Sequence, residues 1–296
     1  MSSLVAAAMG GPSLALAEDT FQAEAGLSYS RFKTDFSRQN TAGAEATYFF
    51  DKLPAQPKDY PLDQAQFVER IGSLSANYSR TDNNFNNFES LNNGWMYRVT
   101  ALLARPETPF FASAAYDSFY AGKLRSGSVE SEADGKFYQL AVGAYVDKTT
   151  ALALDGSRIM TSTKISSGGS TFSEFTDAFT SVGVSGQHLA RLSSGDHVAF
   201  VAGISRSTHE QERAAPEKNR SAFLKATYYP TRMVGLKLGG SFDRGDDSLT
   251  AGKTVEAGAK MFLTPAFSLD LDFQRFYAKA RGDSDNFITI RALVRF

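Results

Sequence analysis

The chain has 296 residues, with 31 Lys and Arg against 32 Asp and Glu, and no cysteine. The lack of cysteine excludes a disulfide framework and a thiolate metal site, and the net charge of −1 argues against a general nucleic-acid binder. No run of about 18 apolar residues occurs, so the sequence contains no transmembrane helix. The unusual feature of the composition is its 24 Phe, 12 Tyr and 24 Gly.

Residues 1–17 are apolar and rich in small side chains, and they end in Ala15-Leu16-Ala17. This A-x-A pattern predicts signal-peptidase cleavage before Glu18 and export from the cytoplasm. No Lys or Arg precedes Arg31, so the usual positive start of a signal peptide is missing. Either the true start lies upstream, or the segment has another role, such as a short buried helix. We expect a signal-peptide-like segment at 1–17 and a single domain at 18–296.

From residue 20 onward, apolar and polar side chains alternate between turn signals. In residues 254–263, for example, Val255, Met261 and Leu263 fall on one face, and Glu256 and Lys260 on the other. This period of two indicates strands with one apolar face. The predicted strands are 20–32, 39–50, 68–79, 94–105, 109–122, 135–146, 150–162, 175–191, 197–206, 219–229, 232–243, 251–263, 266–280 and 286–296.

Two kinds of connection alternate along the chain. Short turns are predicted at 105–109, 147–149, 193–196, 230–232 and 264–266. Longer polar loops are predicted at 33–38, 80–93, 123–134, 163–174, 207–218, 244–250 and 281–285. This alternation is typical of the periplasmic turns and extracellular loops of membrane barrels.

Residues 51–67 are an exception, because this long connection with three of the nine prolines falls at the end where turns are short. We favour an ordered periplasmic turn with a short helix at 62–69. Two alternatives stay open: the segment folds into the lumen as a constriction, or it contacts a periplasmic partner.

These elements predict an all-β fold, a closed antiparallel transmembrane β-barrel of about fourteen strands, although twelve or sixteen stay open. An open sheet in lipid would leave unpaired edge groups that each cost several kcal/mol, and joining the first strand to the last removes both edges. A soluble sandwich fits less well, because strands of about 10–14 residues exceed the usual five or six. Aromatic residues near strand ends, such as Tyr48-Phe49-Phe50, Phe110-Phe111 and Tyr228-Tyr229, are expected to form an interfacial belt.

The polar face of such a barrel lines the lumen, where many positions are Gly or Ser. The charged pore-lining candidates are Glu24, Glu45, Arg98, Asp117, Asp155, Lys225, Lys237, Glu256, Lys260, Asp270, Asp272 and Arg291. One hypothesis is a transverse field between an acidic and a more basic wall, which selects solutes. The alternative is local pairing of Lys237 with Glu256, Lys260 with Asp270 and Arg291 with Glu24.

We expect no enzymatic activity, no metal and no cofactor. The three histidines, His188, His197 and His209, are not at the spacing of metal ligands. No G-x-S-x-G or comparable motif accompanies Ser207 and His209.

The segment 44–79 resembles a family of general bacterial porins from Gram-negative bacteria. The similarity lies in the motifs Tyr48-Phe49-Phe50-Asp51 and Pro61-Leu62-x-x-Ala65-x-Phe67, and in the terminal Phe296. The resemblance implies a bacterial outer-membrane barrel that passes small hydrophilic solutes. Phe296, at the end of an amphipathic strand, matches the signature that the barrel-assembly machinery recognises.

We therefore expect a passive channel in the bacterial outer membrane, in contact with outer-membrane lipid and lipopolysaccharide. Its solute and its state as a monomer or homo-oligomer stay open. One alternative is a plugged barrel that anchors a surface partner or acts as a receptor. A transporter of hydrophobic substrates fits less well, because about three residues between the predicted cleavage site and the first strand leave no room for an N-terminal hatch.

Overall fold

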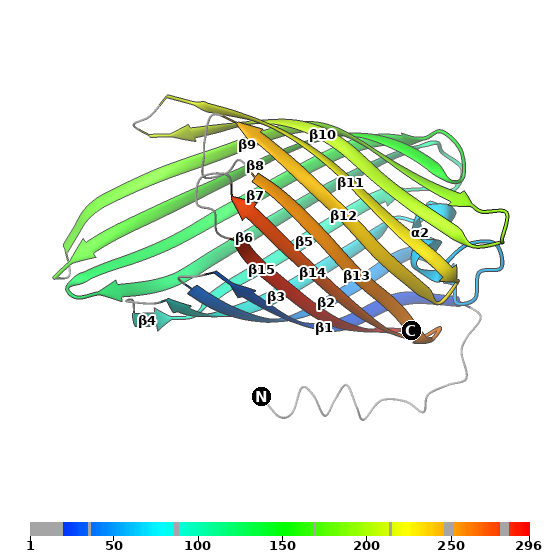
Figure 1. The fold of residues 1–296 in the computed structure, drawn as a ribbon, viewed down its shortest axis with the longest axis horizontal. Helices are drawn as coiled ribbons and strands as arrows, with labels where there is room; N and C mark the ends of the chain where they lie inside the picture. Colours follow the sequence, from blue (N-terminus) through cyan, green and yellow to red (C-terminus); the bar gives the residue numbers. More distant parts are fainter. Residues whose placement is uncertain are drawn as a thin grey trace.

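The computed structural model is a closed barrel of fourteen antiparallel strands (Figure 1). It describes residues 20–34, 37–85, 89–168, 170–212, 215–245, 252–278 and 284–296, so the predicted signal-peptide segment lies outside the described residues. The elements are β1 (Thr20–Lys33), β2 (Ser37–Pro54), η1 (Leu62–Gln64), α2 (Ala65–Glu69), β3 (Ser73–Phe85), β4 (Glu89–Asn92), β5 (Gly94–Ala104), β6 (Phe110–Ser126), β7 (Val129–Tyr145), β8 (Thr150–Ser167), β9 (Ser170–Arg191), β10 (His197–Gln211), β11 (Glu217–Thr231), β12 (Val234–Gly245), β13 (Gly252–Thr264), β14 (Phe267–Ala278) and β15 (Ser284–Arg295).

Closure follows from the strand pairing. β1 pairs with β2 on one side and with β15 on the other, and every other strand of the ring also has two neighbours. The short β4 is an addition to the ring, and it pairs with the far end of β6. The predicted all-β barrel of about fourteen strands is therefore confirmed. Among the described residues, neither short helix is long or apolar enough to cross a membrane.

The two ends of the barrel differ. At one end, tight connections such as Arg232-Met233 and Pro265-Ala266 join the strands, and α2 and the C-terminus lie at this end too (Figure 1). At the opposite end, the pairs β6–β7 and β8–β9 extend as long hairpins (Figure 1). Short turns are periplasmic and long excursions extracellular in barrels of this kind, which gives the orientation.

Three predicted loops are wrong because strands occupy most of their residues. Residues 80–93 hold the end of β3 and all of β4. Residues 123–134 form the top of the β6–β7 hairpin, which is paired as far as Ser126 and Val129 and turns at Gly127. Residues 163–174 likewise belong largely to β8 and β9. Most of these residues are polar on both faces because they extend past the bilayer, and the few apolar ones, such as Leu124 and Ile165, do not alternate with polar ones over a strand's length. Conversely, the strand predicted to begin at 68 starts at Ser73, because α2 occupies the residues before it.

The alternation of faces is confirmed along most strands. Leu27, Leu140, Leu238 and Ile290 are exposed on the outside, while the positions between them face the lumen. Phe21 departs from the pattern. A register shift between Phe21 and Ala23 rotates its ring inward, where it is buried edge-on against Phe49 with 5.7 Å between ring centroids.

The predicted aromatic belt is correct for only one ring of each aromatic pair. In each aromatic pair the period of two sends one ring outward and its neighbour inward. Tyr48 and Phe110 are exposed outside, whereas Phe49 is buried and Phe111 packs on the luminal side against Tyr145. Part of the aromatic surplus therefore lines the periplasmic end of the lumen. A separate outward cluster on β5–β7 includes Trp95 stacked on Tyr97 and is placed toward the extracellular side.

Candidate functional site

The charged side chains predicted to line the pore all occupy luminal positions of their strands, and most are paired. The ion pairs among them, and with two further residues, are Arg98–Asp117, Lys225–Glu256, Lys237–Asp270, Lys237–Asp272, Arg291–Glu45, Lys260–Asp63 and Arg295–Glu24. Lys237 Nζ lies 2.7 Å from Asp270 and 3.0 Å from Asp272. Local pairing thus dominates this wall.

The three specific pairs predicted from the sequence are wrong, however. Lys237 pairs with Asp270 and Asp272 rather than Glu256, Lys260 with Asp63 rather than Asp270, and Arg291 with Glu45 rather than Glu24. Lys237 and Arg291 each reach across an intervening strand, and the partner of Lys260 lies on the connection between β2 and β3. An expectation of pairing between neighbouring strands includes neither case.

Glycines at luminal positions make the long reach feasible. Lys225 of β11 lies opposite Gly239 of β12, which in turn lies opposite Glu256 of β13. Because Gly239 has no side chain, the lysine ammonium group can cross β12 at this position and reach the Glu256 carboxylate. Lys237 reaches Asp272 in the same way across Gly258, where an added Cβ would come within 2.5 Å of Asp272 Oδ1.

Asp155 differs from the other candidates. It lies on the luminal face of β8, between Ala141 of β7 and Gly183 of β9. Within the described part of the chain it forms no ion pair. Its carboxylate therefore faces the lumen without an ion-pair partner among the described residues.

The connection between β2 and β3, residues 55–72, folds into the periplasmic mouth of the barrel. We call it the inner segment; η1 and α2 lie within it. The short helix predicted at 62–69 is confirmed. The favoured placement as a turn outside the barrel is wrong, because the segment packs against side chains that point into the lumen, as the constriction alternative proposed.

The apolar contacts of the inner segment extend to several sectors of the wall. Ala65 and Ile71 pack with Phe21 and Phe49 on β1 and β2. On another side, Phe67 packs against the cluster of Tyr145 and Ala151 on β7 and β8 and that of Leu189, Ala199 and Tyr229 on β9–β11. Contacts on opposite sides of the ring mean that the segment crosses the mouth. The period of two could not predict this position of the inner segment. The sequence does show its apolar residues and the aromatic residues of the strands that pack against them.

Polar contacts fix the segment at its centre. Asp63 accepts hydrogen bonds from Lys260 Nζ, at 2.5 Å, and from Tyr229 Oη, at 3.1 Å. The adjacent Gln64 donates to Tyr229 Oη at 2.8 Å and accepts from Gln187 Nε2 at 3.0 Å. Burial alone would raise the pKa of Asp63, but the Lys260 ammonium and these hydrogen bonds outweigh it and lower the pKa.

Backbone carbonyls hold the beginning of the segment. His197 Nε2 donates to the Asp59 carbonyl at 3.0 Å, and Arg232 donates to that of Pro57 at 3.2 Å. The Tyr60 hydroxyl donates to Glu69, and burial together with this bond raises the pKa of Tyr60. His197 therefore holds the inner segment inside the barrel.

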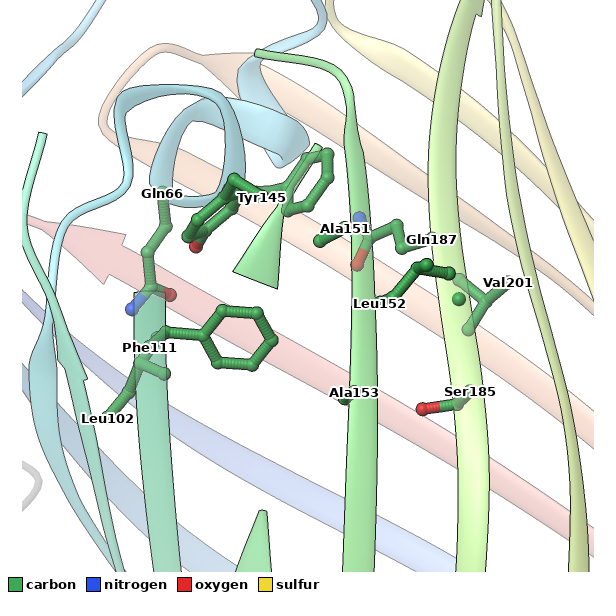
Figure 2. A pocket seen from close by; sticks show the side chains of 12 residues that line it. Gln66, Leu102, Phe111, Tyr145, Ala151, Leu152, Ala153, Ser185, Gln187 and Val201 are labelled. Carbon is green, nitrogen blue, oxygen red and sulfur yellow. The ribbon is translucent and has the colours of Figure 1, made fainter. Parts of the chain in front are cut away.

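A cavity of about 340 Å³ lies between α2 and the wall of β5–β10 (Figure 2). Phe67, Leu102, Phe111 and Tyr145 supply much of its lining. Gln66, Ser185 and Gln187 add polar groups. The cavity is therefore mainly apolar with neutral hydrogen-bonding groups, in contrast to the charged wall on β11–β15, β1 and β2.

Phe296 lies at the seam that closes the barrel. Its backbone carbonyl accepts hydrogen bonds from the amides of Gln22 and Ala23, and its ring is exposed. Its role as an assembly signal stays a prediction.

The chain matches no model of a protein family, and no curated protein matches its sequence. Solved structures do share the fold. Omp33, an outer membrane protein of Acinetobacter baumannii, has a TM-score of 0.54 and 17% identity, covering 95% of this chain and 100% of that one. A loop-deletion mutant of OmpT from Vibrio cholerae has a TM-score of 0.50 and 12% identity over 93% of this chain and 100% of that one. A deletion mutant of TodX, described as a monoaromatic hydrocarbon channel, has a TM-score of 0.51 and 10% identity over 94% and 91%.

Identities this low show the fold alone, which is that of outer-membrane β-barrels. The fold and the apolar exterior together place the protein in the bacterial outer membrane. The resemblance to the general porin family has no matching family model, so it stays a prediction.

Proposed function

We propose that this barrel is a passive channel for small hydrophilic solutes and ions. The observation that carries the proposal is the exposure of charged side chains inside the barrel. Arg98 and Lys225 each keep 48% of their side-chain surface exposed although both point into the lumen. A lumen filled by its own side chains, as in eight-stranded barrels, would bury them.

The inner segment sets the size limit of the proposed channel. Where it packs against the wall, the inward side chains of Phe49, Leu189 and Tyr229 are buried. The barrel is therefore open in its middle and narrow at the periplasmic mouth. Solutes would pass through the gap between the inner segment and the barrel wall. The paired charges on the wall keep it hydrated but do not bind any single ion tightly.

Planar-bilayer recording and liposome swelling test the proposal. We expect discrete conductance steps and a swelling rate that falls as the size of a neutral sugar increases. A plugged barrel that anchors a surface partner would give neither. The matched variant replaces residues 55–72 by a short Gly-Ser turn and should conduct more than the wild type. Equal, vanishing flux from both proteins would contradict the channel.

The cavity beside α2 favours a second candidate, a channel for small apolar molecules. Such a channel would not need an N-terminal hatch, because an internal connection already occupies the mouth. The two candidate functions predict different effects of an aromatic solute on ion conductance. A neutral aromatic solute that reduces ion conductance in the wild type, but not in a Phe111→Ser variant, would favour the apolar route.

A further inference from the structure

Three arginines form a continuous row on the outward face of the barrel. Arg206 of β10 is directly paired with Arg220 of β11, and Arg220 is directly paired with Arg244 of β12. Directly opposed residues of neighbouring strands have Cβ atoms about 4.5–5.5 Å apart. All three side chains are exposed. The register therefore places three guanidinium groups within reach of a single ligand.

The row lies at the extracellular edge of the apolar exterior. Moving toward the periplasm on the same face, Arg206 is followed by Ile204, Arg220 by Ala222 and then Leu224, and Arg244 by Phe242. Ile204 and Phe242 are 62% and 49% exposed, as expected for residues that face lipid chains. The guanidinium groups are thus level with the headgroups of the outer leaflet.

Among the described residues, no acidic side chain balances the charge of this row. Like charges placed directly opposite one another on a sheet are destabilising. On the outward face of β10–β12 the described acid is Glu210, and it lies 3.8 Å from Arg158 of β8. Glu217 and Asp243 occupy luminal positions of their strands. In the described ranges, none of the three arginines has an ion-pair partner.

We propose that this arginine row is a binding site for the phosphate groups of lipopolysaccharide. The guanidinium fork matches phosphate with two parallel hydrogen bonds, and three adjacent forks suit a ligand that carries more than one phosphate. The apolar residues below the row would contact the acyl chains of the same molecule. Lys218, two residues from Arg220 on the same face, adds a further positive charge. The inference does not depend on whether the barrel conducts.

The test uses the complete barrel refolded in zwitterionic detergent and titrated with purified lipopolysaccharide. One variant carries Arg206→Gln, Arg220→Gln and Arg244→Gln. The control removes the same charge through Arg31→Gln, Arg80→Gln and Lys136→Gln. These outward cations lie on β1, β3 and β7, and their directly paired neighbours are uncharged. Heat-modifiable migration on gels verifies that each variant is folded.

We expect the triple variant of the row to weaken lipopolysaccharide binding at least tenfold and the control variant to change it less than twofold. Dephosphorylated lipopolysaccharide should bind the wild type as weakly as intact lipopolysaccharide binds the row variant. Unchanged binding by the row variant would overturn the site. An equal loss of binding in the control variant would show that binding depends on overall positive charge and not on the arginine row, and would overturn the site. Equally tight binding of phosphatidylglycerol micelles would overturn the choice of lipopolysaccharide as the ligand.

Discussion

At the scale of single residues, small side chains decide which luminal charges meet. Gly239 and Gly258 are as informative as the charged residues, because each leaves a gap across which a lysine reaches a carboxylate two strands away. The sequence identified the charged residues and the face on which they lie. It could not identify the partners, because these depend on register and on which intervening positions lack a side chain.

Gly258→Ala tests this role of glycine. The new methyl group would come within 2.5 Å of Asp272 Oδ1 and 2.7 Å of the Leu271 carbonyl oxygen. We expect a loss of about 1–3 kcal/mol in the free energy of unfolding from overpacking, measured by urea titration in detergent micelles. Gly156→Ala is the control, since its nearest contact would be a Ser181 oxygen at 3.7 Å. Equal effects of the two substitutions would contradict the special role of Gly258.

Asp155 is the residue for which a selectivity effect is expected. It has no ion-pair partner in the described part of the chain, so its charge acts directly on passing ions. Two unit charges 4 Å apart in water interact by about 1 kcal/mol, which is roughly a fivefold change in local concentration. Asp155→Asn should therefore lower the preference for cations over anions, measured as reversal potential in a salt gradient. Asp134→Asn, on the outward face of β7, is the control and should leave the reversal potential unchanged.

Among the elements, the inner segment is the one whose position could not be predicted from the sequence. The prolines and the short helix were visible, and the helix is where it was predicted. Its position inside the mouth depends on contacts with β1, β2 and β7–β11, which are distant in sequence. The missing information was that inward aromatics such as Phe49 and Tyr229 need a partner, because a wet lumen would leave them exposed.

The hydrogen bonds of Asp63 predict a pH dependence of this docking. A carboxyl group whose pKa is lowered in the folded state stabilises that state above its unfolded pKa, about 4, and this contribution is lost as the pH falls through the lower, folded value. We expect constant single-channel conductance from neutral pH to about pH 4, and an increase below it as the segment loosens.

Asp63→Asn should remove this dependence. The substitution takes away a charge-assisted hydrogen bond, for which about 1.5–3 kcal/mol is typical, and leaves Lys260 without its carboxylate. The variant should show the larger conductance already at neutral pH. Asp59→Asn is the matched control, because the contact of Asp59 with His197 uses its backbone carbonyl and not its side chain. A pH profile of Asp63→Asn like that of the wild type would show that another group holds the segment.

At the scale of the whole molecule, the period of two proved sufficient for the barrel. Within the bilayer, lipid on one side and water on the other force strict alternation, so strands such as β5 and β10 were placed correctly at their membrane-spanning parts. Beyond the bilayer both faces are wet and alternation is no longer required, which is why the tops of β6–β9 were predicted as loops. The barrel thus inverts the arrangement of a soluble protein, with apolar side chains on the outside and polar ones facing the lumen.

Two adjacent residues of β7 test this inside-out arrangement. Leu140 is 66% exposed on the outside, and Gln139 points into the lumen at nearly the same height. An arginine at a lipid-facing position near the bilayer midplane costs about 2–4 kcal/mol. Leu140→Arg should therefore lower the free energy of unfolding from lipid vesicles by that amount. Gln139→Arg should have little effect on stability, because water solvates the lumen, and should instead shift ion selectivity toward anions. A soluble sandwich would give the same order of stabilities, because its apolar positions would face a core and its polar ones solvent. The readout that distinguishes the two folds is therefore the shift in ion selectivity by Gln139→Arg, which requires a water-filled lumen. Unfolding in detergent micelles and in vesicles, compared for both variants, separates the lipid contribution from packing.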